Sequence, residues 1–241
     1  MPAIPAPQDP LSQALARVDE KKYAEAETLF SGILRQTPDH VEALIGRGYT
    51  RQRQQRIEEA IEDYDQAIDQ APDNVKALGN RASAWFQLGQ PNRCLMDCNR
   101  VIALAPDAPQ AFLLRGTARQ SVGRWAGACQ DFEQALKLAP NDPVVLNQLS
   151  WQLSTCPEPA HRDGLLAINL AVRALEQQNS PAIGDSLAAA QAESGRFQQA
   201  VTTQKVVIRR SLGQVSDKAM ATYNRRLAHY LPNARTWVTQ A

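Results

Sequence analysis

Cys94 and Cys98 are the two side chains of this sequence whose type and spacing come nearest to a chemical site. They stand four residues apart, so on a helix they share one face. A zinc site would need two further ligands, and the surrounding sequence does not supply them in a recognisable spacing. We therefore predict that both thiols pack in the interior as small hydrophobic groups. A disulfide between them is not expected, because side chains at i and i+4 run nearly parallel.

The three histidines, His40, His161 and His229, stand far apart in the sequence and have no serine, cysteine or carboxylate beside them in a triad-like arrangement. No glycine-rich phosphate loop is present either. Asp163, within the run Arg162-Asp163-Gly164, is expected to cap a helix N-terminus. The sequence thus predicts a protein that is not an enzyme, with no catalytic residues, no metal and no cofactor.

Charge and composition exclude several other classes. Lys and Arg number 26 and Asp and Glu 25, giving a net charge of +1, which argues against a nucleic-acid binder. No apolar run approaches the roughly 18 residues of a membrane span. The first residues, MPAIPAPQDP, lack the features of a secretory signal. With only four cysteines in 241 residues, a reducing compartment is favoured, and we expect a cytoplasmic protein.

Prolines mark a repeat that organises the chain. Pro38, Pro72, Pro106 and Pro140 stand 34 residues apart, and each is followed by Asp or Asn. We number each repeat so that its proline is position 32. Small residues then recur at position 20, apolar or aromatic residues at position 24, and glycine at position 15 in two repeats. Apolar residues fall at helical spacing twice in each period, so each repeat should be a pair of helices.

Local chemistry explains where these helices should begin and end. A glycine at position 15, as in Gly89 and Gly123, allows a left-handed cap between the first and second helix. Proline stops the second helix, and the Asp or Asn after it is expected to cap the next one. One helix pair cannot bury both of its faces, so the pairs must stack on one another.

These columns resemble the tetratricopeptide repeat. The resemblance implies an all-α, right-handed α-solenoid of about six helix-turn-helix repeats. The expected repeats cover residues 7–40, 41–74, 75–108, 109–142, 143–180 and 181–214. The fifth carries a 5-residue insertion, with a loop from Thr155 to Asp163. Trp151, Cys156-Pro157 and Arg162-Asp163-Gly164 resemble a variant common in bacterial members, which favours a bacterial source.

The two ends of the chain are expected to differ from the repeats. Residues 1–10 contain four prolines and are predicted to be disordered. Residues 216–231 should form a capping helix with Leu227 and Tyr230 on its apolar face, ended by Pro232, with 232–241 as a tail. The solenoid is therefore predicted over residues 11–231.

The resemblance also implies that the first helix of each pair lines a concave groove. The residues that face this groove stand at positions 2, 5, 6, 9, 12 and 13 of the repeat. We predict that this groove binds a peptide segment of another protein, because amides pair with peptide groups and aromatic side chains act as anchors. An alternative is that Tyr49, Phe86 and Trp151 pack against neighbouring helices. The candidate partner-binding residues are Tyr49, Arg53, Lys76, Asn80, Phe86, Gln110, Thr117, Asn147, Gln148 and Trp151.

The best-known use of the family does not fit. The carboxylate clamp of chaperone-binding members is matched by Asn80 alone, while Ile45, Tyr49, Gln110 and Leu114 occupy its other places.

The two ends of the chain carry net charges of opposite sign. Residues 18–73 hold thirteen Asp and Glu against seven Lys and Arg, and residues 205–241 hold seven Lys and Arg against one Asp. The basic end is either a docking surface for phosphate or an acidic partner, or a solvated capping helix. We predict an interaction scaffold or adaptor; the alternative is an assembly subunit that self-associates through its ends as a homo-oligomer.

Overall fold

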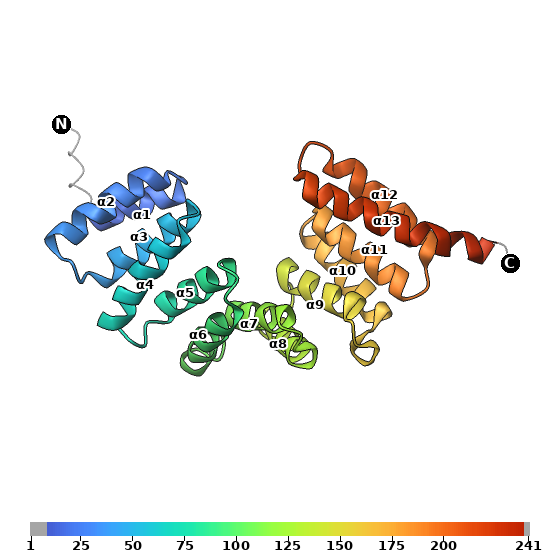
Figure 1. Cartoon of the computed structure of the whole chain (residues 1–241), viewed down its shortest axis with the longest axis horizontal. Coiled ribbons are helices and arrows are strands. Elements are labelled where there is room, and N and C mark those ends of the chain that lie inside the picture. Colours follow the sequence, from blue (N-terminus) through green and yellow to red (C-terminus); the bar gives the residue numbers. More distant parts are fainter. Residues whose placement is uncertain (1–8, 239–241) are drawn as a thin grey trace, which may run out of the picture. The chain divides into compact units, whose positions relative to one another are not determined.

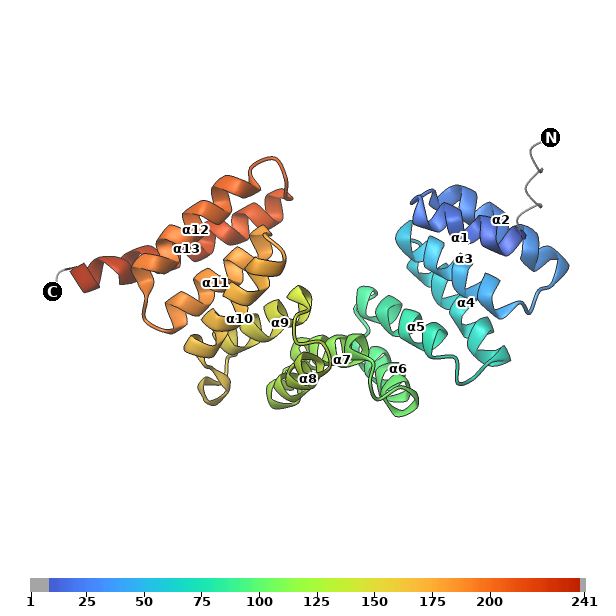
Figure 2. The ribbon, with the colours of Figure 1, turned by 180° about the vertical axis from the view of Figure 1, so that it is seen from behind.

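The computed structural model describes residues 9–238, with side chains through residue 232, and the chain falls into two compact units. Unit 1 ends at Val122 and unit 2 begins at Gly123, so the fourth repeat contributes one helix to each unit. Within each unit, consecutive helices lie side by side in antiparallel pairs (Figure 1, Figure 2). The described residues form no β-strand, and the predicted all-α fold of helix-turn-helix repeats is confirmed.

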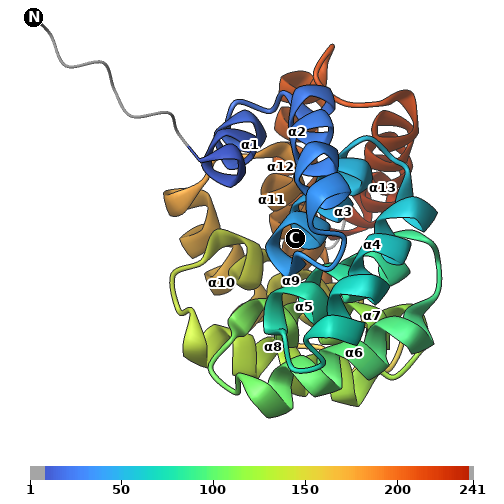
Figure 3. The ribbon, with the colours of Figure 1, turned by 90° about the vertical axis from the view of Figure 1, so that its left-hand side faces the viewer.

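Unit 1 consists of seven helices within its described residues: α1 (Pro10–Asp19), α2 (Tyr23–Gln36), α3 (Val41–Arg53), α4 (Ile57–Gln70), α5 (Val75–Gln87), α6 (Pro91–Leu104) and α7 (Pro109–Ser121). The first helices of successive repeats, α3, α5 and α7, also touch one another in sequence order. Figure 3 views the pairs α3/α4 and α5/α6 from the side of this unit.

Unit 2 consists, over its described residues, of α8 (Trp125–Leu138), α9 (Pro143–Thr155), the short 3-10 helix η1 (Pro159–His161), α10 (Gly164–Gln177), α11 (Pro181–Glu193), α12 (Phe197–Ser211) and α13 (Asp217–Val238). Helices α9 and α10 form one pair and α11 and α12 the next. The predicted insertion lies where expected, between the end of α9 and the start of α10, and Asp163 accepts a hydrogen bond from the Leu166 amide at 2.9 Å as the cap of α10.

Small residues at position 20 allow each helix pair to close. Ala26, Ala60, Cys94, Ala128, Ala167 and Ala200 are all fully buried. At position 8, a Cβ added to Gly48 would come within 2.6 Å of the Tyr64 ring, so only a residue without a side chain fits. The small residues in these columns are therefore required by the short distance between the two packed helices.

The turn between the helices of a pair requires a left-handed residue at position 15. Gly89, Gly123 and Gly195 have φ values of +71°, +74° and +78°. Lys21 and Gln55 occupy the same position in the first two repeats with φ of 59° and 66°. Two non-glycine residues thus adopt a conformation that glycine adopts more easily.

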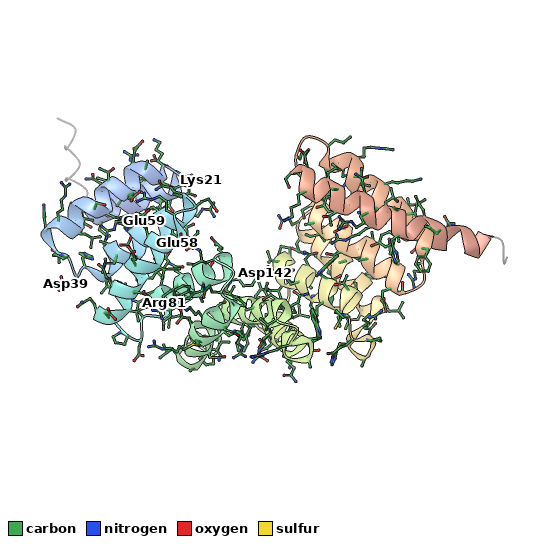
Figure 4. All side chains as sticks on the ribbon, viewed as in Figure 1. Lys21, Asp39, Glu58, Glu59, Arg81 and Asp142 are labelled. Carbon is green, nitrogen blue, oxygen red and sulfur yellow. The ribbon has the colours of Figure 1, made fainter. Side chains whose placement is uncertain are left out.

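The helix caps differ from the prediction by one residue. Asp39 lies in the turn before α3 (Figure 4), and the N-cap is the following residue, His40. In the third and fifth repeats the caps are Asn74 and Asp142, whose side chains accept from backbone amides of α5 and α9. The residue directly after the proline belongs to the turn, because the cap itself needs an extended backbone.

Both ends of the chain also depart from expectation. Asp9 caps α1 and Pro10 is its first residue, so these two residues are ordered; residues 1–8 lie outside the described part. At the other end α13 continues through Pro232 to Val238. A proline inside a helix removes one amide hydrogen bond and crowds the carbonyl four residues earlier, yet here the helix continues beyond it. The predicted apolar face of this helix is confirmed, because Tyr230 is buried with Leu227 packed beside it.

Within residues 9–238, every helix is too short or too polar to pass through a lipid bilayer.

Candidate partner-binding surface

The first helices of unit 1 carry a small polar hollow of about 300 Å³ between α3 and α5. It is lined by Tyr49, Gln52, Arg53, Gln55, Asn80, Ser83 and Gln87. These side chains offer amide, hydroxyl, phenol and guanidinium groups, so the hollow can both donate and accept hydrogen bonds. Such a lining suits the alternating donors and acceptors of a peptide backbone.

The floor of this polar hollow is held by a chain of hydrogen bonds. The buried Tyr64 hydroxyl donates to Gln52 Oε1 at 2.9 Å, and Gln52 Nε2 donates to Ser83 Oγ at 3.2 Å. Burial raises the pKa of Tyr64, so its hydroxyl stays a donor. The bonds join α4, α3 and α5 and orient the amide of Gln52 before any partner is present.

A second, mainly apolar hollow of about 450 Å³ adjoins the first, among α5, α6 and α7. Asn80 and Ser83 line both hollows. Gly79 opens the second one, because a Cβ built there would meet no atom within 4 Å. The remaining lining is formed by Val75, Lys76, Ala82, Cys98, Val101, Ala108, Gln110, Ala111 and Leu114.

The cations at these hollows are not neutralised by neighbouring carboxylates. Arg53 and Lys76 are exposed, and neither forms an ion pair within the described residues, although the Arg53 guanidinium lies 5.5 Å from the centre of the Tyr23 ring. Two acids of this unit are engaged elsewhere: Arg81, labelled in Figure 4, donates to Asp97 and Asp65. The surface therefore presents free positive charge beside its amides.

Five of the predicted binding residues meet at these two hollows. Tyr49 and Arg53 line the polar one, Lys76 and Gln110 line the apolar one, and Asn80 lines both. The repeat register was sufficient to group them, because positions 2, 6, 9 and 13 face the same side of each first helix.

The other predicted residues lie elsewhere. Phe86 lines neither hollow; it is half-buried and packs against the buried cluster that contains Cys94 and Leu95, as the alternative prediction expects. The Thr117 hydroxyl donates to the Leu113 carbonyl of its own helix at 2.8 Å. Asn147, Gln148 and Trp151 belong to α9 of unit 2, where Trp151 lines a separate hollow.

The prediction for Cys94 and Cys98 is confirmed: both are free and buried, with their sulfur atoms 3.8 Å apart. The contact with Cys94 and burial both raise the pKa of Cys98, so this thiol stays protonated. Within the residues that the structure describes, no group of His, Cys, Asp and Glu side chains could hold a metal ion. Sequence reasoning missed that Cys98 lines the apolar hollow; its position on the second helix gave no such signal.

Family models match three stretches of the chain, and all three describe tetratricopeptide repeats. The matches cover residues 48–89, 81–149 and 186–206. Together with the helix pairs, the buried position-20 column and the left-handed position-15 residues, they show that the chain belongs to the tetratricopeptide-repeat proteins. Proteins of this family are in general interaction modules without catalytic activity.

Solved structures with the same fold are numerous. The chain is similar to the pilF protein of Pseudomonas aeruginosa (TM-score 0.76, 15% identity, 91% of this chain and 96% of that one). It is also similar to a chain of the Cut9–Hcn1 hetero-tetramer of the APC/C (TM-score 0.76, 15% identity, 96% and 44%) and to MamA (TM-score 0.59, 19% identity, 70% and 90%). These identities show the fold alone. No curated protein matches the sequence.

Proposed function

We propose that this chain is a non-catalytic scaffold or adaptor that binds an extended segment of a partner protein across the two hollows of unit 1. One observation carries the proposal: Asn80 and Ser83 line a polar and an apolar hollow at once, so one ligand can reach both. Supporting it, interaction is what the tetratricopeptide fold is generally used for.

The two hollows divide the recognition between them. The apolar hollow has room for one large side chain of the partner, which would be removed from water against Val75, Val101 and Leu114. The polar hollow offers its amides to the backbone next to that side chain, with Asn80 at the junction. Arg53 and Lys76 favour a segment that carries an acidic residue on either side of its apolar anchor.

Gly79 provides a sharp test of this proposal. Peptides selected on the full chain from a random displayed library should contain an apolar anchor, and their affinity can be measured by calorimetry. Gly79→Leu places a side chain in the apolar hollow from a Cβ that meets no atom within 4 Å, and it should weaken binding at least about tenfold. Gly79→Ala adds a single methyl group and serves as the matched control, with affinity close to that of the wild type. Equal affinities of all three proteins would refute binding at this hollow.

A second candidate function is self-association of copies through their ends. The observation behind it is the opposite sign of residues 18–73 and 205–241. Assembly of this kind should weaken as salt screens the charges. Light scattering between low and high ionic strength checks it: a monomer at every salt concentration would exclude it.

A further inference from the structure

A third hollow, of about 530 Å³, lies within unit 2 where α9, α11 and α13 meet beside the start of α12. Helices α9, α11 and α12 form its apolar and aromatic side with Trp151, Ala189, Ala192 and Phe197. Arg225, Arg226 and His229 of α13 line the other side. The sequence placed Trp151 in a groove but gave no indication that the capping helix would form the opposite wall.

The aromatic wall is fixed in place before any ligand binds. The Arg226 guanidinium lies over the Trp151 ring, 4.3 Å from its centre, and forms an ion pair with the buried Asp185 of α11. Asp185 also accepts a hydrogen bond from the buried Gln204 amide at 3.0 Å. Since each of these groups is held by another, the indole loses little freedom when a ligand arrives.

After the ion pairs of its lining residues are taken into account, this hollow carries a net positive charge. Asp185 neutralises Arg226, and Glu193, the acid that lines the hollow, faces Arg162 at 3.3 Å. Arg225 is exposed and has no ion-pair partner in the part of the chain that the structure describes. The surrounding helices add to this bias, because residues 205–232 contain six Lys and Arg and a single acid, Asp217.

We propose that this hollow binds an acidic peptide segment of another protein, with an aromatic side chain against Trp151 and Phe197 and a neighbouring carboxylate on Arg225. Offset or edge-to-face contact with the two rings favours an aromatic anchor. A guanidinium that has no other partner can hold a carboxylate through two parallel hydrogen bonds. A nucleic acid fits this wall less well, because binding a phosphate backbone needs a row of cations and the hollow is mainly apolar.

This site goes beyond the proposed function, since it uses other residues in another unit. Its test is therefore independent: Gly79→Leu should leave binding at the Trp151 hollow unchanged, whatever it does to unit 1.

The probe is a fluorescein-labelled, C-terminally amidated peptide Ser-Gly-Glu-Asp-Phe-Glu-Asp-Gly-Ser, and fluorescence anisotropy on the full chain reports its binding. Arg225→Gln removes an exposed charge that bonds to no described residue, so the fold should survive, and it should weaken binding about tenfold. Lys218→Gln removes the same charge from an exposed site of the same helix that does not line the hollow, and should change the affinity less than about twofold.

Two altered probes separate the parts of the site. A peptide with Ala in place of Phe should bind at least about tenfold more weakly, as should one with Gln and Asn in place of the acids. The inference is overturned if the wild-type chain does not bind the acidic probe, if Arg225→Gln and Lys218→Gln weaken it equally, or if an oligothymidylate of the same charge binds as tightly as the peptide.

Discussion

Repeats in units 1 and 2 fill the same contact between paired helices with different side chains. In the second and third repeats, both in unit 1, position 7 of the first helix is arginine and position 23 of the second is aspartate: Arg47 donates to Asp63, and Arg81 to Asp97. In the fifth repeat, within unit 2, the same two positions hold the buried Leu149 and Leu170. The helix pair therefore tolerates either a buried ion pair or a buried apolar pair.

This difference concerns the position-7 arginines, whose charge is not available for binding. The position-7 arginines Arg47 and Arg81 point between helices, and their charge is matched by an aspartate that is almost completely buried. In unit 2, Arg225 and Arg226 instead come from the capping helix and line a hollow. A repeat array can thus take the cations of its binding surface from a helix outside the regular columns.

The largest effect is expected from breaking one buried ion pair. Asp97→Ala leaves Arg81 with only the half-exposed Asp65, and should destabilise unit 1 by about 3–5 kcal/mol. The double change Arg81→Leu/Asp97→Leu copies the fifth repeat and should restore stability to within about 1 kcal/mol of the wild type. Urea unfolding checks both, with Asp65→Ala as the control for an exposed partner, at less than about 1 kcal/mol. A double variant as unstable as Asp97→Ala would mean that an apolar pair cannot replace the buried ion pair at these positions.

Glycines give the next largest effect and separate closed contacts from open ones. Gly164 at the start of α10 has no room: an added Cβ would lie 2.7 Å from the amide nitrogen of Ser194, the residue that follows α11. Gly164→Ala should therefore destabilise unit 2 by about 1–3 kcal/mol, because backbone cannot move aside cheaply. Gly79→Ala in unit 1 should instead stabilise by up to about 1 kcal/mol, as expected for an unobstructed helix position. Thermal unfolding of the two variants should shift in opposite directions.

A smaller effect concerns the left-handed turns. Gln55→Gly in unit 1 should stabilise by about 1 kcal/mol, since its φ of 66° is unfavourable for a residue with a side chain. Gly195→Ala in unit 2 should cost about the same, because its φ is +78° and nothing else obstructs a Cβ there. Chemical unfolding of both variants measures the cost of a left-handed backbone at a residue with a side chain. The free energy of unfolding should rise in one variant and fall in the other. Two changes of the same sign would show that the turns differ in more than φ.

The smallest effect is the acid sensitivity of unit 1. Burial acts to raise the pKa of Glu27, but hydrogen bonds from Arg51, Gln54 and Arg56 lower that pKa overall. A carboxyl with a lowered folded-state pKa contributes stability above its unfolded pKa and loses it as the pH falls through the folded pKa. Glu27→Gln should therefore reduce the loss of stability between neutral and acidic pH. Urea midpoints across that range compare it with the wild type; parallel curves would contradict the assignment.

Periodicity predicted much of this molecule and missed specific parts for physical reasons. The proline column, the small residues at position 20 and Gly89 and Gly123 located the regular helix pairs because each is a steric requirement that repeats. The shift of the N-cap to His40 and the ordered Asp9 were missed because caps depend on the local backbone. For Phe86, at position 12, spacing left both groove and core open, and the structure packs its half-buried ring against the cluster that contains Cys94 and Leu95.

The sequence by itself determined that this protein is an all-α array of tetratricopeptide repeats, and it selected Tyr49, Arg53, Lys76, Asn80 and Gln110 as neighbours on one surface. Both conclusions follow from local spacing, which a helix converts directly into a face. Only the tertiary structure decided that Asn80 joins two hollows, that the arginines at position 7 are matched inside, and that Arg226 covers Trp151. Those contacts link residues 16 to 75 positions apart, and no spacing rule specifies which of the available side chains will meet.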